Sequence, residues 1–208
     1  MSSYIMHMCV SQKVKEKLGL TDKFIYGSVL PDIIKSVTGD RDGTHYIEIV
    51  HIDGEIRCLP KINTAINELN IKDKEIRLGY IAHLIEDYIW FNEYIPSYAK
   101  KINEEQVRYL FDDSVHTNEE FRDVMYSDYS NCNKYIANKY NVDFNQLLGK
   151  ILEQIVDKKE KQIVLECTKC LENQDITKNM FMTKESIDSY INRCTEIVEK
   201  EIKKILEE

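Results

Sequence analysis

The chain has 208 residues, a usual size for one globular domain, and 43% of them are hydrophobic, enough for a sizeable core. Its formal net charge of -8 argues against a surface that binds polymeric nucleic acid, because contact with phosphates needs a basic stripe. Glycine and proline are scarce, with 7 and 3 residues, so we expect an all-α fold with a single helical domain over residues 1–208.

The N-terminal part begins with a predicted helix and continues into an apolar turn. Apolar residues at helical spacing predict a helix over 4–18, and the glycine that follows ends it. Residues 24–34 are apolar but contain Gly27 and Pro31, which interrupt helical patterns. We therefore predict a buried turn there that leads into a short helix.

The next segment, residues 36–60, is rich in glycine and is predicted to be mostly loop. Within it, residues 46–58 resemble a small β-hairpin around Asp53-Gly54, a pair that is common in two-residue hairpin turns. This hairpin is the one exception that we expect to a helical fold.

Helical patterning dominates the rest of the chain. The last two of the expected helices carry long amphipathic stripes and no histidine, which indicates a scaffold. The expected helices cover residues 61–69, 73–94, 104–112, 118–125, 128–139, 144–172 and 184–206.

The sequence indicates a cytoplasmic protein. It contains no apolar run long enough to span a membrane, and its first ten residues lack the basic and apolar regions of a signal peptide. The six cysteines are scattered, and Cys167 and Cys170 lie within a helical pattern without a second pair, so we expect free thiols. The others are Cys9, Cys58, Cys132 and Cys194.

The strongest local signal for chemistry is His83-Leu-Ile-Glu-Asp87, within the helix expected over 73–94. Residues four apart lie on one helix face, so this imidazole and this carboxylate can bind one metal ion together. The same face carries large apolar residues and should point into the protein, where a charged pair is costly unless it is paired or bound to metal. A core histidine hydrogen-bonded to its own aspartate is the structural alternative, and the motif alone does not decide between them.

Three further residues are weak candidates when each is taken singly. His7 lies on the apolar side of the first helix, Asp32 follows a proline where helix N-caps are frequent, and His45 lies in the glycine-rich loop. Together with His83 and Asp87 they supply imidazoles and carboxylates, the ligands expected for Zn, Mn or Fe. Two such ions can share a carboxylate, activate a water molecule and neutralise a phosphoryl group.

The order of these residues resembles the zinc-dependent phospholipase C family, which includes secreted bacterial phospholipases and is related to the fungal single-strand nucleases. The likeness extends as far as Trp90 and is weak beyond it. It is carried by His7, by Phe-Ile-Tyr-Gly-Ser-Val-Leu-Pro-Asp over 24–32, by Thr44-His45, and by Gly-Tyr-Ile-Ala-His-Leu-Ile-Glu-Asp-Tyr-Ile-Trp over 79–90.

The resemblance implies an all-helical zinc enzyme that cleaves a phosphodiester or a phosphomonoester. It implies that Asp32, His45, His83 and Asp87 hold one zinc ion, and that His7 and a shared Asp87 hold a second. It also implies that Asp32 orients or deprotonates the attacking water. The expected substrate is a small-molecule or lipid phosphoester.

Two parts of the family pattern are not matched. The secreted enzymes use their mature N-terminal amine and a tryptophan as ligands, whereas this chain begins Met-Ser-Ser-Tyr. They also bind a third ion through two histidines and a glutamate, for which this chain offers Glu93 and the pair His116 and Glu120. We favour a solvated face for that pair, predict Asp128 as an extra ligand, and expect two ions rather than three.

Two other functions fit parts of the pattern. The HD-type phosphohydrolases are also helical with His and Asp ligands, but they need an adjacent His-Asp pair, which this sequence lacks. A helical binding or regulatory module that keeps one structural metal is the alternative without catalysis. The sequence favours a metal-dependent hydrolase of a phosphate ester over both, and it leaves the oligomeric state open.

Overall fold

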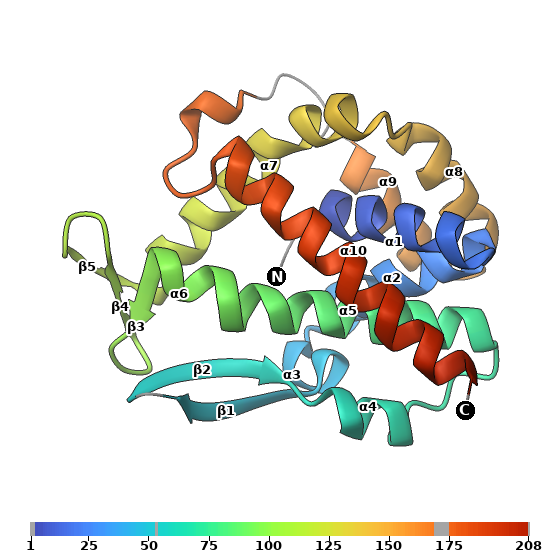
Figure 1. Ribbon diagram of the computed structural model, residues 1–208, viewed down its shortest axis with the longest axis horizontal. Helices are drawn as coiled ribbons and strands as arrows, with labels where there is room; N and C mark the ends of the chain where they lie inside the picture. The colour runs from blue at the N-terminus through green and yellow to red at the C-terminus, as the bar shows by residue number, and fades with distance from the viewer. Residues whose placement is uncertain (1–2, 53, 169–174, 208) are drawn as a thin grey trace.

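Helix α5 (Lys74–Ile89) runs through the middle of the molecule, and other helices pack around it (Figure 1). Its side chains are buried almost continuously from Leu78 onward, as expected for a helix with this many apolar residues. The computed structural model describes residues 3–52, 54–168 and 175–207, and most of them are helical. The prediction of a helical fold is confirmed, with two small antiparallel sheets added.

The remaining elements follow the chain in a simple order. The first half contains α1 (Tyr4–Leu18), α2 (Asp22–Thr38), α3 (Arg41–His45), β1 (Ile47–Ile52), β2 (Glu55–Pro60) and α4 (Ile62–Glu68), before α5. The second half contains the π-helical segment η1 (Trp90–Tyr94), α6 (Ile95–Tyr98), β3 (Ala99–Lys101), β4 (Gln106–Tyr109), β5 (Val115–Thr117), α7 (Asn118–Tyr140), α8 (Phe144–Gln154), α9 (Lys158–Thr168), the 3-10 turn η3 (Ile176–Lys178) and α10 (Lys184–Glu207).

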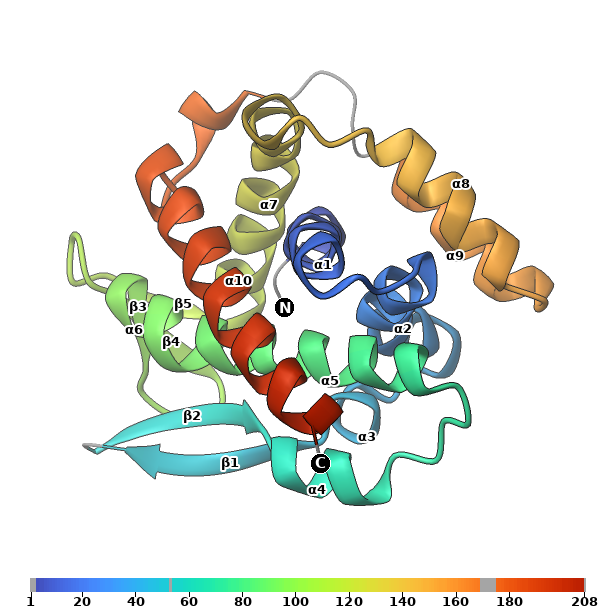
Figure 2. The same ribbon diagram turned by 45° about the vertical axis from the view of Figure 1, so that its right-hand side comes forward.

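Helix α1 lies inside the bundle. Figure 2 shows it nearly end-on, with α7 and α10 on one side, α2 on the other and α5 below it. The Ser3 side chain caps its N-terminus, and Gly19 ends it with a φ of 68°, a conformation that glycine adopts without strain. The predicted boundaries are therefore confirmed, and His7 lies on a fully buried segment.

Helix α2 contradicts the predicted turn over 24–34, because the helix continues through both Gly27 and Pro31. Proline lacks the N–H that would bond to the carbonyl four residues earlier, which here belongs to Gly27. Packing against α5 offsets this loss. A Cβ atom on Gly27 would overlap the carbonyl oxygen of Ile76, and one on Gly79 would overlap that of Phe24, so paired glycines let the two helices touch.

The predicted hairpin is confirmed. Strands β1 and β2 pair in antiparallel register, with Ile52 opposite Glu55, and Gly54 has the positive φ of 78° that such turns need. Asp53, the other predicted turn residue, lies outside the described residues. The loop expected before the hairpin also contains the short helix α3, whose N-terminus is capped by the Asp40 side chain.

The helix predicted over 104–112 is wrong, because this segment forms part of a three-stranded sheet. In β4, Val107 and Tyr109 are buried while their neighbours are exposed, an alternation with a period of two that fits a strand. The strand then turns through Asp113, which has a φ of 59°, and returns as β5.

The C-terminal helices differ from the prediction mainly in where one helix ends and the next begins. The helices expected over 118–125 and 128–139 form one continuous helix, α7, which begins with a capping box between Thr117 and Glu120. The helix expected over 144–172 is divided into α8 and α9. The final expected helix agrees with α10 to within a residue.

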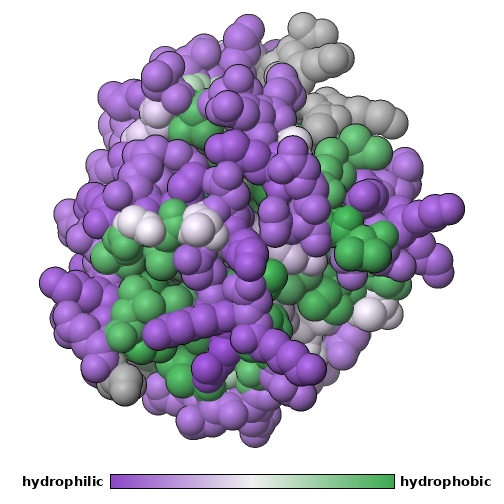
Figure 3. Space-filling view, turned by 90° about the vertical axis from the view of Figure 1, so that its right-hand side faces the viewer, coloured by the Kyte–Doolittle hydropathy of each residue, from purple (hydrophilic) through white to green (hydrophobic). Residues whose placement is uncertain are grey.

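The surface matches the acidic, polar composition. Hydrophilic residues cover most of the face shown in Figure 3, with separate hydrophobic areas between them. No described helix has the length and apolar character needed to cross a membrane. The free thiols predicted for Cys9, Cys58, Cys132 and Cys194 are confirmed, whereas Cys170 and the side chain of Cys167 lie outside the described part of the structure.

Candidate metal centre

Five polar side chains from four helices meet beside α5. His7 comes from α1, Asp32 from α2 and His45 from α3, whereas His83 and Asp87 lie one turn apart on α5. Asp32 is 4% exposed, and the other four side chains are completely buried. The structure thus brings together five residues, separated by up to eighty positions in the sequence, that the sequence marked as candidate ligands.

The Asp87 carboxylate lies between the imidazoles and faces them with both oxygens. Its Oδ1 is 3.7 Å from His7 Nε2, and its Oδ2 is 3.7 Å from His83 Nε2 and 3.9 Å from His45 Nε2. On the far side, Asp32 Oδ1 is 3.4 Å from His45 Nε2. Two ligands of one tetrahedral zinc ion, each about 2.0–2.1 Å from it, are separated by about 3.4 Å, so these spacings suit shared cations.

Each imidazole is held through its Nδ1 atom, so that Nε2 faces the centre. Nδ1 of His83 donates to the backbone carbonyl of Ser28 at 2.7 Å, which requires Nδ1 to carry the proton and leaves a lone pair on Nε2. Nδ1 of His45 lies 2.9 Å from the Thr44 hydroxyl. This outer contact is the usual way in which metal-binding histidines are oriented.

His7 is held by a third kind of partner, the carboxylate of Glu86. His7 Nδ1 and Glu86 Oε2 are 3.0 Å apart, and both side chains are completely buried. The His7 ring also stacks on the His83 ring, with centroids 3.9 Å apart. Burial, reinforced by the charge of Asp87, raises the pKa of Glu86, so this contact fixes the orientation of the His7 ring rather than adding a further negative charge.

Several atoms at the centre have no hydrogen-bond partner within the described residues. They are Asp32 Oδ1, His45 Nε2 and His83 Nε2, and all three are shielded from solvent. A buried polar atom without a partner costs about 1–3 kcal/mol, so a cluster of them calls for a ligand. Imidazole nitrogen and carboxylate oxygen are suitable donors for zinc, and the residues present therefore fit a divalent ion.

The charge states also suit cation binding. Burial, reinforced for His7 by the nearby His83, lowers the pKa of both imidazoles and keeps them neutral. Burial alone would raise the pKa of Asp32, but the close imidazoles of His45 and His83 outweigh it and lower that pKa. For Asp87, nearby positive groups likewise outweigh burial and bring the pKa to about 2. The centre thus offers neutral nitrogens on His7 and His83 and ionised oxygens on Asp32 and Asp87.

A cleft of about 460 Å³ adjoins the centre. Lys35, on its wall, has its Nζ 3.7 Å from Asp32 Oδ1. Tyr126 and Tyr129 also line the cleft, and burial followed by the charge of Asp32 raises the pKa of Tyr126. Lys35 thus lies between the cleft and Asp32, and none of the five side chains of the centre lines the cleft itself.

Asp128, predicted as an extra ligand, is placed elsewhere. Its Oδ1 accepts a hydrogen bond from the backbone N–H of Met180 at 3.0 Å, and its Oδ2 accepts from Phe181 at 2.8 Å and Met182 at 3.0 Å. Its carboxylate is thus occupied by the loop before α10. The sequence did not reveal this role, because the partners are backbone groups more than fifty residues away.

The other residues considered for a third ion also lie outside the centre. Glu120 belongs to the capping box of α7, and His116 lies 3.7 Å from it with its ring stacked on Tyr109. The His116 side chain is 32% exposed and that of Glu120 is 61% exposed. Glu93 pairs instead with Arg193 of α10. These contacts agree with the solvated face favoured for His116 and Glu120.

Sequence reasoning missed the groups that orient the imidazoles. Glu86 had a readable signal, because it lies three residues after His83 on a helix whose face is buried. The Ser28 carbonyl had none, since every residue carries a carbonyl group and only the packing of α2 on α5 selects this one. Thr44 precedes His45 directly, but adjacency alone does not predict a contact between side chains.

Comparison with known proteins identifies a family for this chain. The family profile described as zinc dependent phospholipase C matches residues 6–203 of the 208, a stretch that includes all five side chains of the centre. The searches of curated proteins and of solved structures found no match. Since the profile covers nearly the whole sequence, the chain belongs to the zinc-dependent phospholipase C family.

Proposed function

We propose that this protein hydrolyses a phosphate ester at a centre for two zinc ions formed by His7, Asp32, His45, His83 and Asp87. The observation that carries the proposal is the convergence of three Nε2 atoms and two carboxylates, with spacings of 3.4–3.9 Å, in a buried setting. Membership of the family supports zinc as the metal and a hydrolytic reaction. We assign Asp32, His45, His83 and Asp87 to one ion, and His7 with the second oxygen of Asp87 to the other.

When bound, zinc would polarise the phosphoryl oxygens and lower the pKa of a water molecule toward neutrality. The protein residues do the positioning. The Asp87 carboxylate bridges the two halves of the centre, because its two oxygens face different histidines. Ser28, Thr44 and Glu86 hold the imidazole rings, so the ligands need little reorganisation when the substrate binds.

Asp32 is proposed to orient the attacking water and accept its proton. Its neighbour Lys35 lines the cleft, and the lowered pKa of Asp32 keeps its carboxylate ionised. A low pKa also makes this carboxylate a weak base, so its main part is to accept a hydrogen bond from the water and orient it. Lys35, 3.7 Å from Asp32, lies where it can attract an anionic phosphoester toward the centre. The apolar residues of the cleft favour a lipid or another amphiphile as the substrate over a fully hydrated phosphate.

The proposal is tested by zinc content and phosphoesterase activity in the full chain and its His83→Ala variant. We expect zinc in the purified protein, hydrolysis of a phosphodiester or phosphomonoester, and a loss of at least about 100-fold in kcat/KM in the variant. Metal ions supply several kcal/mol to the transition state, and each 1.36 kcal/mol is a factor of ten. His51→Ala, at an exposed position in β1, is the matched control and should keep full activity.

The same experiment separates an enzyme from a helical module with a structural metal. An enzyme should lose activity in His83→Ala while its circular dichroism spectrum stays helical. A zinc-loaded wild-type protein that hydrolyses no phosphoester, and whose variant only loses thermal stability, would instead support the structural metal and refute the proposed reaction.

A further inference from the structure

The cleft beside the metal centre is cationic, although the protein as a whole is acidic. The chain carries a net charge of -8, yet the side chains that line this cleft include six cations and one carboxylate, Glu55. Such a local reversal of sign concentrates anions at the opening. The six cations are Lys35, Arg41, Arg57, Lys100, Lys101 and Arg122.

Four of these six cations lie close to acidic side chains. Glu55 is paired with Lys100 at 2.6 Å and with Arg57 at 3.2 Å. Lys35 lies beside Asp32, and Arg122 contacts acidic neighbours on its own helix. The carboxylate in the cleft is therefore already engaged by two cations and is poorly placed to bind a cationic head group.

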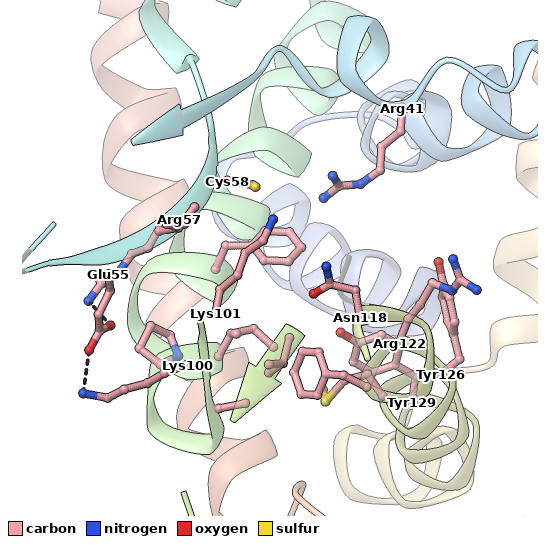
Figure 4. A pocket seen from close by; sticks show the side chains of 18 of the residues that line it. Arg41, Glu55, Arg57, Cys58, Lys100, Lys101, Asn118, Arg122, Tyr126 and Tyr129 are labelled. Carbon is pink, nitrogen blue, oxygen red and sulfur yellow. Dashed lines mark hydrogen bonds and ion pairs between the residues drawn. The ribbon is translucent and has the colours of Figure 1, made fainter. Parts of the chain in front are cut away.

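Arg41 and Lys101 are the two cations left without a close acidic partner. Lys101 forms no ion pair with any described residue, and the ion pair of Arg41 is a long one, 3.9 Å from Asp42, a side chain that is 80% exposed. In Figure 4 the two side chains reach into the cleft from different elements, α3 and β3, and their charged ends point toward each other. Two like charges that converge in this way attract an anion between them.

The rest of the lining is apolar and aromatic. It includes Phe91, Phe121 and Met125, and the Arg41 guanidinium lies over the Phe91 ring at 5.4 Å from its centroid. That ring face is where a quaternary ammonium group would otherwise bind, so the arginine occupies the aromatic site that a choline head group needs. The cleft thus combines a place for acyl carbons with a place for an additional anion.

We propose that Arg41 and Lys101 form an anion subsite that selects a lipid phosphoester whose head group carries a second phosphate besides the scissile one. This inference rests on the proposed function of the neighbouring centre. The zinc centre would neutralise the scissile phosphate, and the guanidinium and ammonium groups would bind the second, since both bind phosphate oxygens well. A zwitterionic choline head group carries no second anion for this subsite, and the Phe91 ring that could bind its ammonium group is already covered by Arg41.

The test uses zinc-loaded full chain and two soluble lipids, dihexanoyl phosphatidylinositol 4-phosphate and dihexanoyl phosphatidylcholine. We expect the phosphorylated lipid to be cleaved with a kcat/KM at least about tenfold higher, because hydrogen bonds between charged groups are the strong ones. The double variant Arg41→Gln/Lys101→Gln should lose that preference, because its rate for the phosphorylated lipid falls while the Phe91 ring is opened to the choline head group. The control variant Lys72→Gln/Arg108→Gln removes the same charge from exposed positions outside the cleft and should keep the preference.

Calorimetric binding of the same two lipids to metal-free protein gives a readout that does not depend on turnover. Tighter binding of the phosphorylated lipid that is lost in the double variant supports the subsite even if no lipid is hydrolysed, in which case only the proposed reaction fails. Equal binding of both lipids, or a preference that survives in the double variant, would overturn the subsite. Inositol 1,4-bisphosphate, which has no acyl chains, should bind at least about tenfold more weakly, and equal affinity would exclude a lipid as the ligand.

Discussion

Two buried acidic side chains in this protein, Asp32 and Asp128, differ in what surrounds them. They are 4% and 1% exposed, so burial does not distinguish them. Asp128 accepts three backbone N–H groups with its two oxygens, whereas Asp32 Oδ1 forms no hydrogen bond to any described residue and faces the imidazole of His45. The first arrangement anchors a loop, and the second is suited to bind a cation.

The number of hydrogen bonds that a carboxylate accepts, rather than its burial, separates structural acids from candidate metal ligands. A buried carboxylate that already accepts several N–H groups has few lone pairs left for a metal. A carboxylate oxygen beside the lone pairs of neutral imidazoles receives no hydrogen bond from them, and it stays available to an added cation. Variants of Asp128 test the structural role, and variants near the metal centre test the binding of a cation.

The largest effect on folding is expected from Asp128→Ala. The change would leave the backbone N–H groups of Met180, Phe181 and Met182 without their acceptor, and each such loss costs about 1–3 kcal/mol. We expect the free energy of unfolding, measured in urea, to fall by about 3 kcal/mol or more. The zinc content per folded molecule should stay the same.

The control for that change is Asp123→Ala, on the same helix, where the aspartate side chain is 69% exposed. It should change stability by no more than about 0.5 kcal/mol. If Asp128→Ala instead removed zinc while stability was preserved, Asp128 would be a ligand and the contrast drawn here would fail.

A smaller loss of stability is expected from a substitution that moves α2 away from α5, the two helices that carry Asp32, His83 and Asp87. Gly27→Ala places a methyl group against the carbonyl of Ile76, and relief requires α2 to shift relative to α5. Overpacking of this kind costs about 1–3 kcal/mol. Because Asp32 and Ser28 are on α2 and their partners are on other helices, zinc affinity should fall together with stability.

Gly149→Ala is the matched control for the glycine pair, since the same methyl group on α8 would meet no atom within 4 Å. It should stabilise the protein by about 0.4–1 kcal/mol, the usual gain for alanine over glycine in a helix. Equal responses of the two variants would show that contact between α2 and α5 does not depend on Gly27.

The smallest of these effects is expected from Glu86→Gln, which keeps the size of the side chain and replaces the carboxyl group beside His7 Nδ1, whose pKa burial raises, with an amide. Loss of an outer partner of a metal-binding histidine lowers metal affinity by about 10–100-fold. Competition with a zinc chelator would measure this change, and Glu93→Gln, on the surface and paired with Arg193, should leave the affinity unaltered. Unchanged zinc affinity in Glu86→Gln would remove His7 from the proposed ligand set.

The sequence predicted the parts of the fold that depend on local patterns. Helix α1 and the β1–β2 hairpin follow from apolar spacing and from a glycine at the turn, and both were predicted with nearly the observed limits. Helix α2 was missed because Pro31 and Gly27 interrupt helices in isolation, while the close contact with α5 that tolerates them involves residues some fifty positions away. Local rules carry no information about such contacts.

The candidate site shows the same limit. The five residues of the centre were named from their types and their order, because imidazoles and aspartates on apolar segments are uncommon enough to be informative. Asp128 has the same local signature, an acid on a buried helix face, and only the position of the loop at Met180–Met182 reveals its different role. The cationic cleft also escaped prediction, since its lysines and arginines are scattered over α2, α3, β2, β3 and α7.

The proposed reaction requires zinc to bind among these five side chains. The decisive measurement is anomalous diffraction at the zinc absorption edge from crystals of the zinc-loaded protein. We predict one peak about 2.0–2.2 Å from Nε2 of His45 and His83, and a second next to His7 and Asp87. Crystals saturated with zinc that show no anomalous peak among the five side chains would contradict a metal centre at this position.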